Sequence, residues 1–218
     1  MHDRKAWACA ALCTAALLAH AAAVAQAAWS LEPLDASGRI TYFIAAGEDS
    51  AGYLATDREL AVWALQAWER AARGALRFVE AGTEAEALVR VHFVSSSFGQ
   101  YGEMRPLAID GRRGAAVYIR PDTGALGPDI ARLAAADPLL RDVIVYLTCV
   151  HELGHALGLR HTAEFADIMY SFQFGGDIPA FFGRYRARLA MRADLANVAV
   201  LSRNDEAELQ ALYAPAAP

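Results

Sequence analysis

The chain has 218 residues, 56% of them hydrophobic, and a formal net charge of −5. This length accommodates one domain with a sizeable core. The mild acidity excludes the strongly basic surface that is typical of nucleic-acid-binding proteins, so no nucleic-acid partner is expected.

The N-terminal segment, residues 1–27, has the features of a secretory signal peptide. Two basic residues precede an apolar run over residues 6–18, and small residues follow it. His20 and Gln26 interrupt a run that is short for a bilayer, which disfavours a membrane anchor. We expect a secreted or periplasmic protein with no membrane attachment after signal cleavage, whose single domain spans residues 28–218.

The first half of this domain predicts strands separated by a helix. Enrichment in β-branched and aromatic residues predicts strands over residues 39–44, 76–80, 87–94 and 115–119. Apolar residues at helical spacing predict a helix over residues 56–73, which Thr56 and Glu59 would start as a capping box. Residues 95–114 are rich in serine and glycine and are expected to form loops, with brief pairing at residues 107–109.

A second helix is predicted from Asp137 and Pro138, an N-cap residue followed by proline at the first helical position. The helix runs into a histidine-rich segment, and its apolar character implies burial. Cys149 lies within it and is expected to be a buried, unpaired small side chain. A terminal helix is predicted over residues 202–213, capped by Ser202 and the residues after it.

Two histidines at the end of the second helix have the spacing of a metal site. His151 and His155 are four residues apart, so on a helix they share one face with Cβ atoms about 5–6 Å apart. This separation suits two imidazoles that bind one zinc ion, and Glu152 is placed beside them to act on a bound water. His161 can join them only if the chain turns back, and Gly158 stands where a helix-ending turn is needed.

The resulting pattern, H-E-x-x-H-x-x-G-x-x-H over residues 151–161, resembles the zinc signature of the metzincin metallopeptidases. Asp167-Ile168-Met169-Tyr170 resembles the Met-turn of that clan. Thr162 and the spacing from His161 to Met169 are similar to those of the matrixin family.

The resemblance implies a fold class and an arrangement of the chain. It implies an α+β, metzincin-like (zincin) fold, in which a twisted, mostly parallel sheet with an antiparallel edge strand packs on two long helices, with a Met-turn and a C-terminal helix. Residues 28–218 would then form a single matrixin-like catalytic domain. Residues 171–201 would be an extended connection after the Met-turn, either an added helix that covers the core or a rim of the substrate cleft.

The resemblance also implies the chemistry of a secreted zinc metalloendopeptidase with one catalytic Zn²⁺. The metal ligands would be His151, His155 and His161, and Glu152 would be the general base. The supporting residues would be Gly158, Met169 and Tyr170: a turn, a packing floor beneath the metal, and a hydroxyl whose direction the sequence leaves open. Where matrixins usually have proline after this tyrosine, the chain has Ser171.

The substrate of such an enzyme is a peptide or protein, laid along an edge strand near Tyr118 or Ile109. Val150 and residues after Tyr170 are expected to shape the pocket for the residue that follows the cut. We expect the protein to be a monomer.

Several other assignments remain open. The chain could be a secreted zinc-binding protein without catalytic activity, and Glu164 could replace His161 as a ligand. Calcium binding by Asp110, Asp122 and Asp129 has no support beyond their carboxylates. His92 is expected on the opposite face of its strand from the buried residues and is not assigned to the site.

Overall fold

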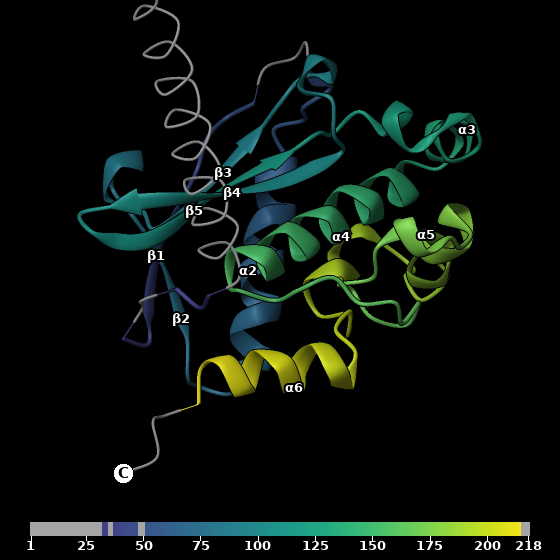
Figure 1. The fold of residues 1–218 in the computed structure, drawn as a ribbon. Coiled ribbons are helices and arrows are strands. Elements are labelled where there is room, and N and C mark those ends of the chain that lie inside the picture. Colours follow the sequence, from purple (N-terminus) through teal and green to yellow (C-terminus); the bar gives the residue numbers. More distant parts are fainter. Residues whose placement is uncertain (1–31, 35–36, 48–50, 215–218) are drawn as a thin grey trace, which may run out of the picture.

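The computed structural model describes residues 32–34, 37–47 and 51–214, and it combines a sheet with several helices (Figure 1). The strands are β1 (Arg39–Ile44), β2 (Arg77–Glu80), β3 (Val89–Phe93), β4 (Gly102–Ile109) and β5 (Arg112–Ile119). The helices are α2 (Asp57–Ala71), α3 (Pro128–Ala136), α4 (Pro138–Ala156), α5 (Ile178–Arg186) and α6 (Arg203–Leu212). The predicted signal peptide lies outside the described residues. None of the described helices is long and apolar enough to cross a membrane.

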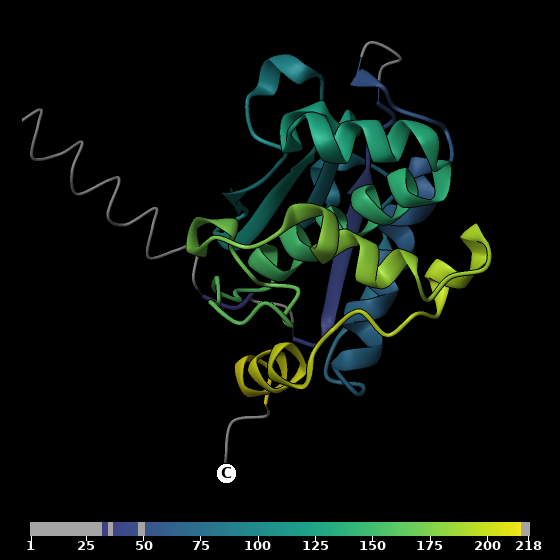
Figure 2. The same cartoon turned by 90° about the vertical axis from the view of Figure 1, so that its right-hand side faces the viewer.

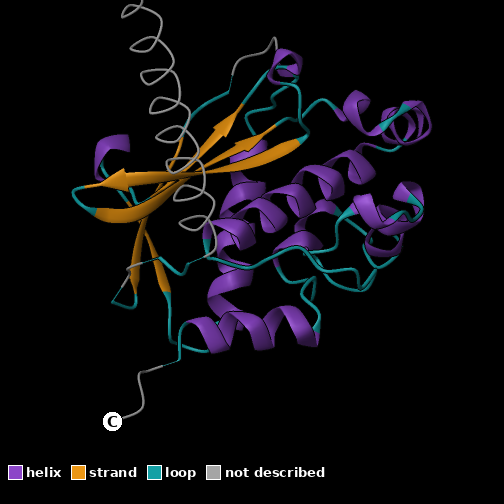
Figure 3. Ribbon diagram, viewed as in Figure 1, coloured by secondary structure: helices purple, strands orange, loops and turns teal. Residues whose placement is uncertain are grey.

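Within the described residues, the sheet has the strand order β2-β1-β3-β5-β4. β4 lies at one edge and runs antiparallel to β5, whereas the other neighbouring strands are parallel. Figure 3 shows the sheet on one side of the molecule and the long helices on the other. The long helices α2 and α4 pack on each other, and α4 also contacts β4 and β5. The predicted fold class is confirmed.

The edge strand corrects the expectation that residues 95–114 form loops. β4 pairs with β5 in register from Gly102 opposite Ile119 to Ile109 opposite Arg112. Asp110 and the glycine after it both have positive φ, 50° and 76°, which is the two-residue turn that suits a tight hairpin. Gly102 and Pro106 lower the strand propensity of this segment, but pairing with buried β5 overrides it, and an edge position tolerates proline.

The start of α2 differs from the predicted capping box. Thr56 itself has helical dihedrals, φ −73° and ψ −14°, and among the described atoms its side chain makes no capping hydrogen bond. The first turn is instead organised by Asp57, which is fully buried. Its carboxylate accepts from the Leu54 N–H at 2.9 Å and pairs with the Arg141 guanidinium of α4. The start of α2 is thus held by a buried ion pair with α4 and not by the predicted capping box.

The helix that carries the histidines begins as predicted. The Asp137 carboxylate accepts from the N–H groups of Leu139 and Leu140 at 3.1 and 3.3 Å, which confirms the N-cap. Helix α3, which lies directly before it, was not predicted. It buries Ile130 and Ala134, and its first residue is also a proline.

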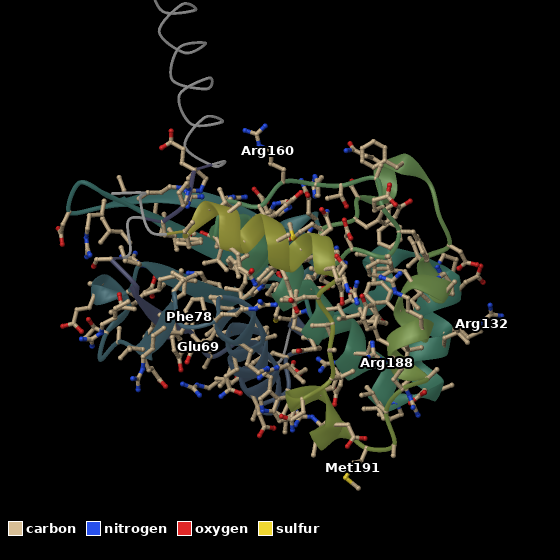
Figure 4. All side chains as sticks on the ribbon, turned by 90° about the horizontal axis from the view of Figure 1, so that it is seen from below. Glu69, Phe78, Arg132, Arg160, Arg188 and Met191 are labelled. Atoms are coloured by element: carbon tan, nitrogen blue, oxygen red, sulfur yellow. The ribbon has the colours of Figure 1, made fainter. Side chains whose placement is uncertain are left out.

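The extended connection over residues 171–201 contains α5, which lies beside α4 (Figure 2). Its arginines fasten it to earlier parts of the chain. The Arg186 guanidinium pairs with Asp137 at 2.7 Å, and that of Arg192 pairs with Asp142 of α4 at 2.9 Å. Met191 projects outward from this segment (Figure 4). The connection therefore includes an added helix packed on α4, and the cavity described below shows that the same segment also reaches the histidines.

Candidate metal centre

The helix that bears His151 and His155 ends in a glycine turn. Gly158 has φ +103°, and its N–H donates to the His155 carbonyl at 3.0 Å. The Leu159 N–H donates to the Gly154 carbonyl, also at 3.0 Å. These two bonds form a Schellman motif, which satisfies the last carbonyls of the helix and reverses the chain. The reversal carries His161 back toward the helix.

The three histidines converge on one point. The Nε2 atom of His161 lies 3.2 Å from that of His151 and 3.0 Å from that of His155. The Nδ1 atom of His151 lies 2.7 Å from the Ile168 carbonyl oxygen, and that of His155 lies 2.9 Å from the Leu159 carbonyl oxygen. A carbonyl can only accept, so each Nδ1 carries the proton and each Nε2 directs a lone pair inward.

The charge state of the rings favours a cation. Burial lowers the pKa of His151 to about 3 and that of His155 to about 4, and it also lowers the pKa of His161. All three rings are therefore neutral near pH 7. Three neutral imidazoles with converging lone pairs fit zinc, for which nitrogen ligands in tetrahedral sites are typical, and leave a fourth position open.

Within the described residues, the group of side chains that could hold a metal consists of these three histidines, and Glu164 does not belong to it. Glu164 is exposed. His92 lies away from the group, stacked on Tyr118 and near Glu84. Cys149 is buried and unpaired among the described cysteines, as expected.

Glu152 lines the same cavity as His151 and His161, and it is only 7% exposed. Burial raises its pKa to about 8, with a further contribution from the charge of Glu103, while a hydrogen bond from the Met104 backbone acts in the opposite direction. Gly102, at the start of β4, makes room for the carboxylate. A Cβ atom at this position would lie 2.6 Å from Glu152 Oε1 and 2.8 Å from Thr148 Cγ2, so a larger residue there would have to displace the carboxylate.

Met169 packs against α4 at Gly154, the residue before His155. It is fully buried, and a Cβ atom added at Gly154 of α4 would overlap its sulfur. The glycine between the two helical histidines thus allows the methionine to pack against the helix backbone. The sequence pattern does not single out Gly102 or Gly154, because each is needed only for the close approach of a residue from another element.

A buried carboxylate of α6 holds the Met-turn. Asp205 accepts from the backbone N–H groups of Ile168 at 2.9 Å, Met169 at 3.3 Å and Ser202 at 2.7 Å. The last bond completes the capping box that was predicted for Ser202. The same Ile168 residue supplies the carbonyl that orients His151. The bond between Asp205 and Ser202 is local to the start of α6, whereas the contact of Asp205 with the Met-turn depends on the tertiary structure.

Tyr170 also lines the cavity, but its hydroxyl donates to the Gly175 carbonyl at 2.7 Å. The hydroxyl is therefore engaged within its own loop. At the next residue, the Ser171 N–H donates to the Thr162 carbonyl at 3.2 Å, a bond that a proline could not make.

The cavity beside the histidines has a volume of about 310 Å³. Its apolar walls come from several elements and include Leu126, Leu147, Ile168, Phe172, Phe181 and Phe182. Val150 is not among the described residues that line it, which corrects its expected role. Val150 is fully buried on the other side of α4, where its carbonyl accepts from the Trp68 indole at 2.8 Å.

The sequence model of the matrixin family matches residues 34–175. No curated protein matches the chain closely enough to count as a relative. The matched segment includes the sheet, α2, α4, the three histidines and the Met-turn. Membership in this family supports a zinc metalloprotease, and the histidine cluster fits its zinc site. The chain belongs to the matrixin family.

Proposed function

We propose that this protein is a secreted zinc-dependent endopeptidase in which Glu152 is the general base. The observation that carries the proposal is the convergence of three imidazole Nε2 atoms beside a cavity that a buried carboxylate also lines. A structural zinc site is normally closed by four protein ligands, whereas three ligands leave a position for water or substrate.

Each residue of the site has a separate role in hydrolysis. Zinc held by His151, His155 and His161 would polarise the scissile carbonyl and make the attacking water more acidic. The charge of a bound cation would lower the pKa of Glu152 again and keep the carboxylate ionised, so that Glu152 takes a proton from that water and delivers it to the leaving amine. Met169 packs beneath the ligands without binding the metal.

The substrate backbone binds along the outer edge of β4. In the described part of the chain, β4 pairs with β5 on one side only, and its start lies over Glu152. An extended peptide can add to such an edge through main-chain hydrogen bonds. Of the two edges considered from the sequence, Ile109 belongs to β4, whereas Tyr118 lies on the inner strand β5.

The decisive experiment replaces Glu152 by alanine. We expect Glu152→Ala to abolish cleavage of a peptide library while about one zinc ion per chain is retained, because the carboxylate moves protons but does not bind the metal. Glu164→Ala is the matched control, since Glu164 is an exposed glutamate that does not belong to the group of potential metal ligands. It should keep both the metal and the activity.

Two outcomes would contradict the proposal. Undiminished cleavage by Glu152→Ala would rule out the general base. A wild-type protein that holds zinc but cleaves no member of the library would favour the alternative, a secreted zinc-binding protein without catalytic activity.

Export is part of the same proposal. We expect the protein recovered outside the producing cell's cytoplasm to begin near residue 28, which N-terminal sequencing would measure. Recovery of the intact N-terminus in the exported protein would contradict removal of residues 1–27.

A further inference from the structure

The wall of the cavity includes a helix that lies beyond the segment matched by the family model. The match ends at residue 175, and α5 begins at Ile178. Phe181 and Phe182 of this helix are each 4% exposed and line the cavity beside His151 and Glu152. The helix therefore not only covers the core but also reaches the proposed active site.

Helix α5 is held firmly enough to serve as a wall. Its first turn is capped by Asp177, whose carboxylate accepts from the Ala180 N–H at 2.9 Å. The Arg184 guanidinium stacks over the rings of Phe181 and Tyr185 at 4.3 and 4.7 Å, and it donates to the Ala166 carbonyl. The Arg186 ion pair attaches the end of α5 to the start of α4.

The two phenylalanines differ in what else they support. The ring of Phe181 packs against Tyr170, with centroids 6.1 Å apart, and against Phe172 at 5.2 Å. A change at Phe181 would therefore disturb the loop after the Met-turn. Phe182 has ring contacts with Phe181 at 5.4 Å and with Phe172 at 6.4 Å. It can be altered with less effect on the metal centre.

Away from the histidines the cavity is lined mainly by apolar and aromatic side chains, together with the neutral polar residues Gln100, Thr148, Ser171 and Gln173. Leu126, Leu147 and Ile168 line it together with Phe182, and among the described lining residues the ionisable side chains are Glu152, His151, His161 and Tyr101 and Tyr170. A charged substrate side chain in this space would lose its hydration and find no opposite charge beyond the metal end, which is costly. An apolar side chain would gain the free energy of burial.

We propose that Phe182 is a specificity-determining residue that limits the size of the apolar substrate side chain this cavity accepts. The inference rests on the proposed function, because it assigns the cavity to a substrate residue next to the cut. Discrimination by one methylene group in an apolar pocket is typically about 10–200-fold, so removal of a ring from the wall should change the preference measurably.

The test compares peptides that carry alanine, leucine, phenylalanine or tryptophan on each side of the cut. In Phe182→Ala, the ratio of kcat/KM for the tryptophan peptide to that for the leucine peptide should rise by about tenfold or more over wild type at one of these positions. Phe182→Leu should produce a smaller rise in the same direction. It also keeps the test informative if Phe182→Ala does not fold, since alanine leaves the larger cavity.

Leu189→Ala is the matched control, because Leu189 is a buried apolar residue just after α5 that does not belong to the described cavity lining. It should leave the ratio unchanged. The dissociation constants of the same peptides on the Glu152→Ala background, where no cut occurs, should change in parallel with the kcat/KM ratios.

The outcomes separate this inference from the proposed function. If the wild type cleaves the peptides but both Phe182 variants keep the wild-type ratio within twofold, the role of Phe182 is overturned and the peptidase assignment stands. If the wild type cleaves none of them, the peptidase assignment fails, and the affinities measured on the Glu152→Ala background decide whether the cavity binds apolar side chains at all. Affinities that do not depend on Phe182 would overturn the inference in that case.

Discussion

The metal centre and the cavity wall next to it are built from the chain in different ways. The ligands of the centre come from one segment, residues 151–161, in which a helix and the turn after it set their spacing. The wall combines side chains from α4, the loop before α3, the Met-turn and α5. The reactive groups are therefore specified locally, whereas the shape of the binding space depends on how distant elements pack.

Variants in the two regions are therefore expected to lose different properties. A change at the centre should remove the metal and leave the fold of the wall. A change in the attachments of the wall should alter peptide preference and leave the metal. The Met-turn lies between them, because Asp205 of α6 holds the backbone that orients His151.

The largest effect is expected for His161→Ala. Loss of one of three ligands should weaken zinc affinity by more than about 100-fold, since loss of a group that merely orients a ligand already costs about 10–100-fold. Competition with a chelator would measure the change, and peptide cleavage should fall with it. Normal metal content in this variant would mean that another residue, such as Glu164, is the third ligand.

The next largest effect is expected for Asp205→Asn. An amide can accept fewer of the three backbone bonds and brings a donor toward them, so unfolding free energy should fall by about 2–4 kcal/mol and zinc affinity should also fall. Denaturant titration and zinc titration would measure both. Asp194→Asn is the control, since Asp194 accepts two backbone bonds far from the histidines and should leave zinc affinity intact.

A smaller effect is expected for Gly158→Ala. A side chain at φ +103° is strained by about 1–3 kcal/mol, and its Cβ atom would lie 3.0 Å from the Glu32 carbonyl oxygen. Gly74→Ala is the matched control, because φ there is +91° and an added Cβ would meet no described atom within 4 Å. Both variants should lose stability, but Gly158→Ala should also bind zinc more weakly. Equal zinc affinity in the two variants would mean that the turn at Gly158 does not set the positions of the metal ligands.

The smallest effect is expected for Arg186→Ala, which removes the ion pair between the end of α5 and the start of α4, far along that helix from the histidines. Burial raises the pKa of Asp137, but the Arg186 guanidinium and the Leu140 N–H outweigh it and hold the pKa below its ordinary value. Because the folded-state pKa is depressed, this stabilisation is present above the unfolded pKa of about 4 and is lost as the pH falls through the folded value.

The variant should therefore be less stable than wild type by at most about 1 kcal/mol at pH 7, since the pair is partly exposed. The difference should shrink toward pH 3 in denaturant titrations at several pH values. Arg132→Ala, which breaks an exposed pair on α3, should change stability less at every pH. A change in the zinc content of Arg186→Ala would contradict the expectation that the cavity wall can be altered without affecting the metal centre.

Much of the fold could be predicted because local patterns and tertiary packing agree. Asp137 and Ser202 cap helices where the sequence indicates, and β3 alternates buried and partly exposed residues as its pattern predicts. Only the end of β4, residues 107–109, was expected to pair, because the serine and glycine content of residues 95–114 is typical of loops, although Asp110 and Gly111 are a recognised turn signal. The predicted box at Thr56 and Glu59 is not formed because Thr56 already has helical dihedrals and the Glu59 carboxylate pairs with Arg192, a residue distant in the sequence.

The sequence by itself determined the chemistry, because an i,i+4 spacing on a helix and a glycine turn bring His151, His155 and His161 together without reference to distant parts of the chain. Only the tertiary structure decided which side chains surround them. Gly102 fits over Glu152, Asp205 reaches the Met-turn, and Phe182 closes the cavity, because the packing of separate elements brings them there.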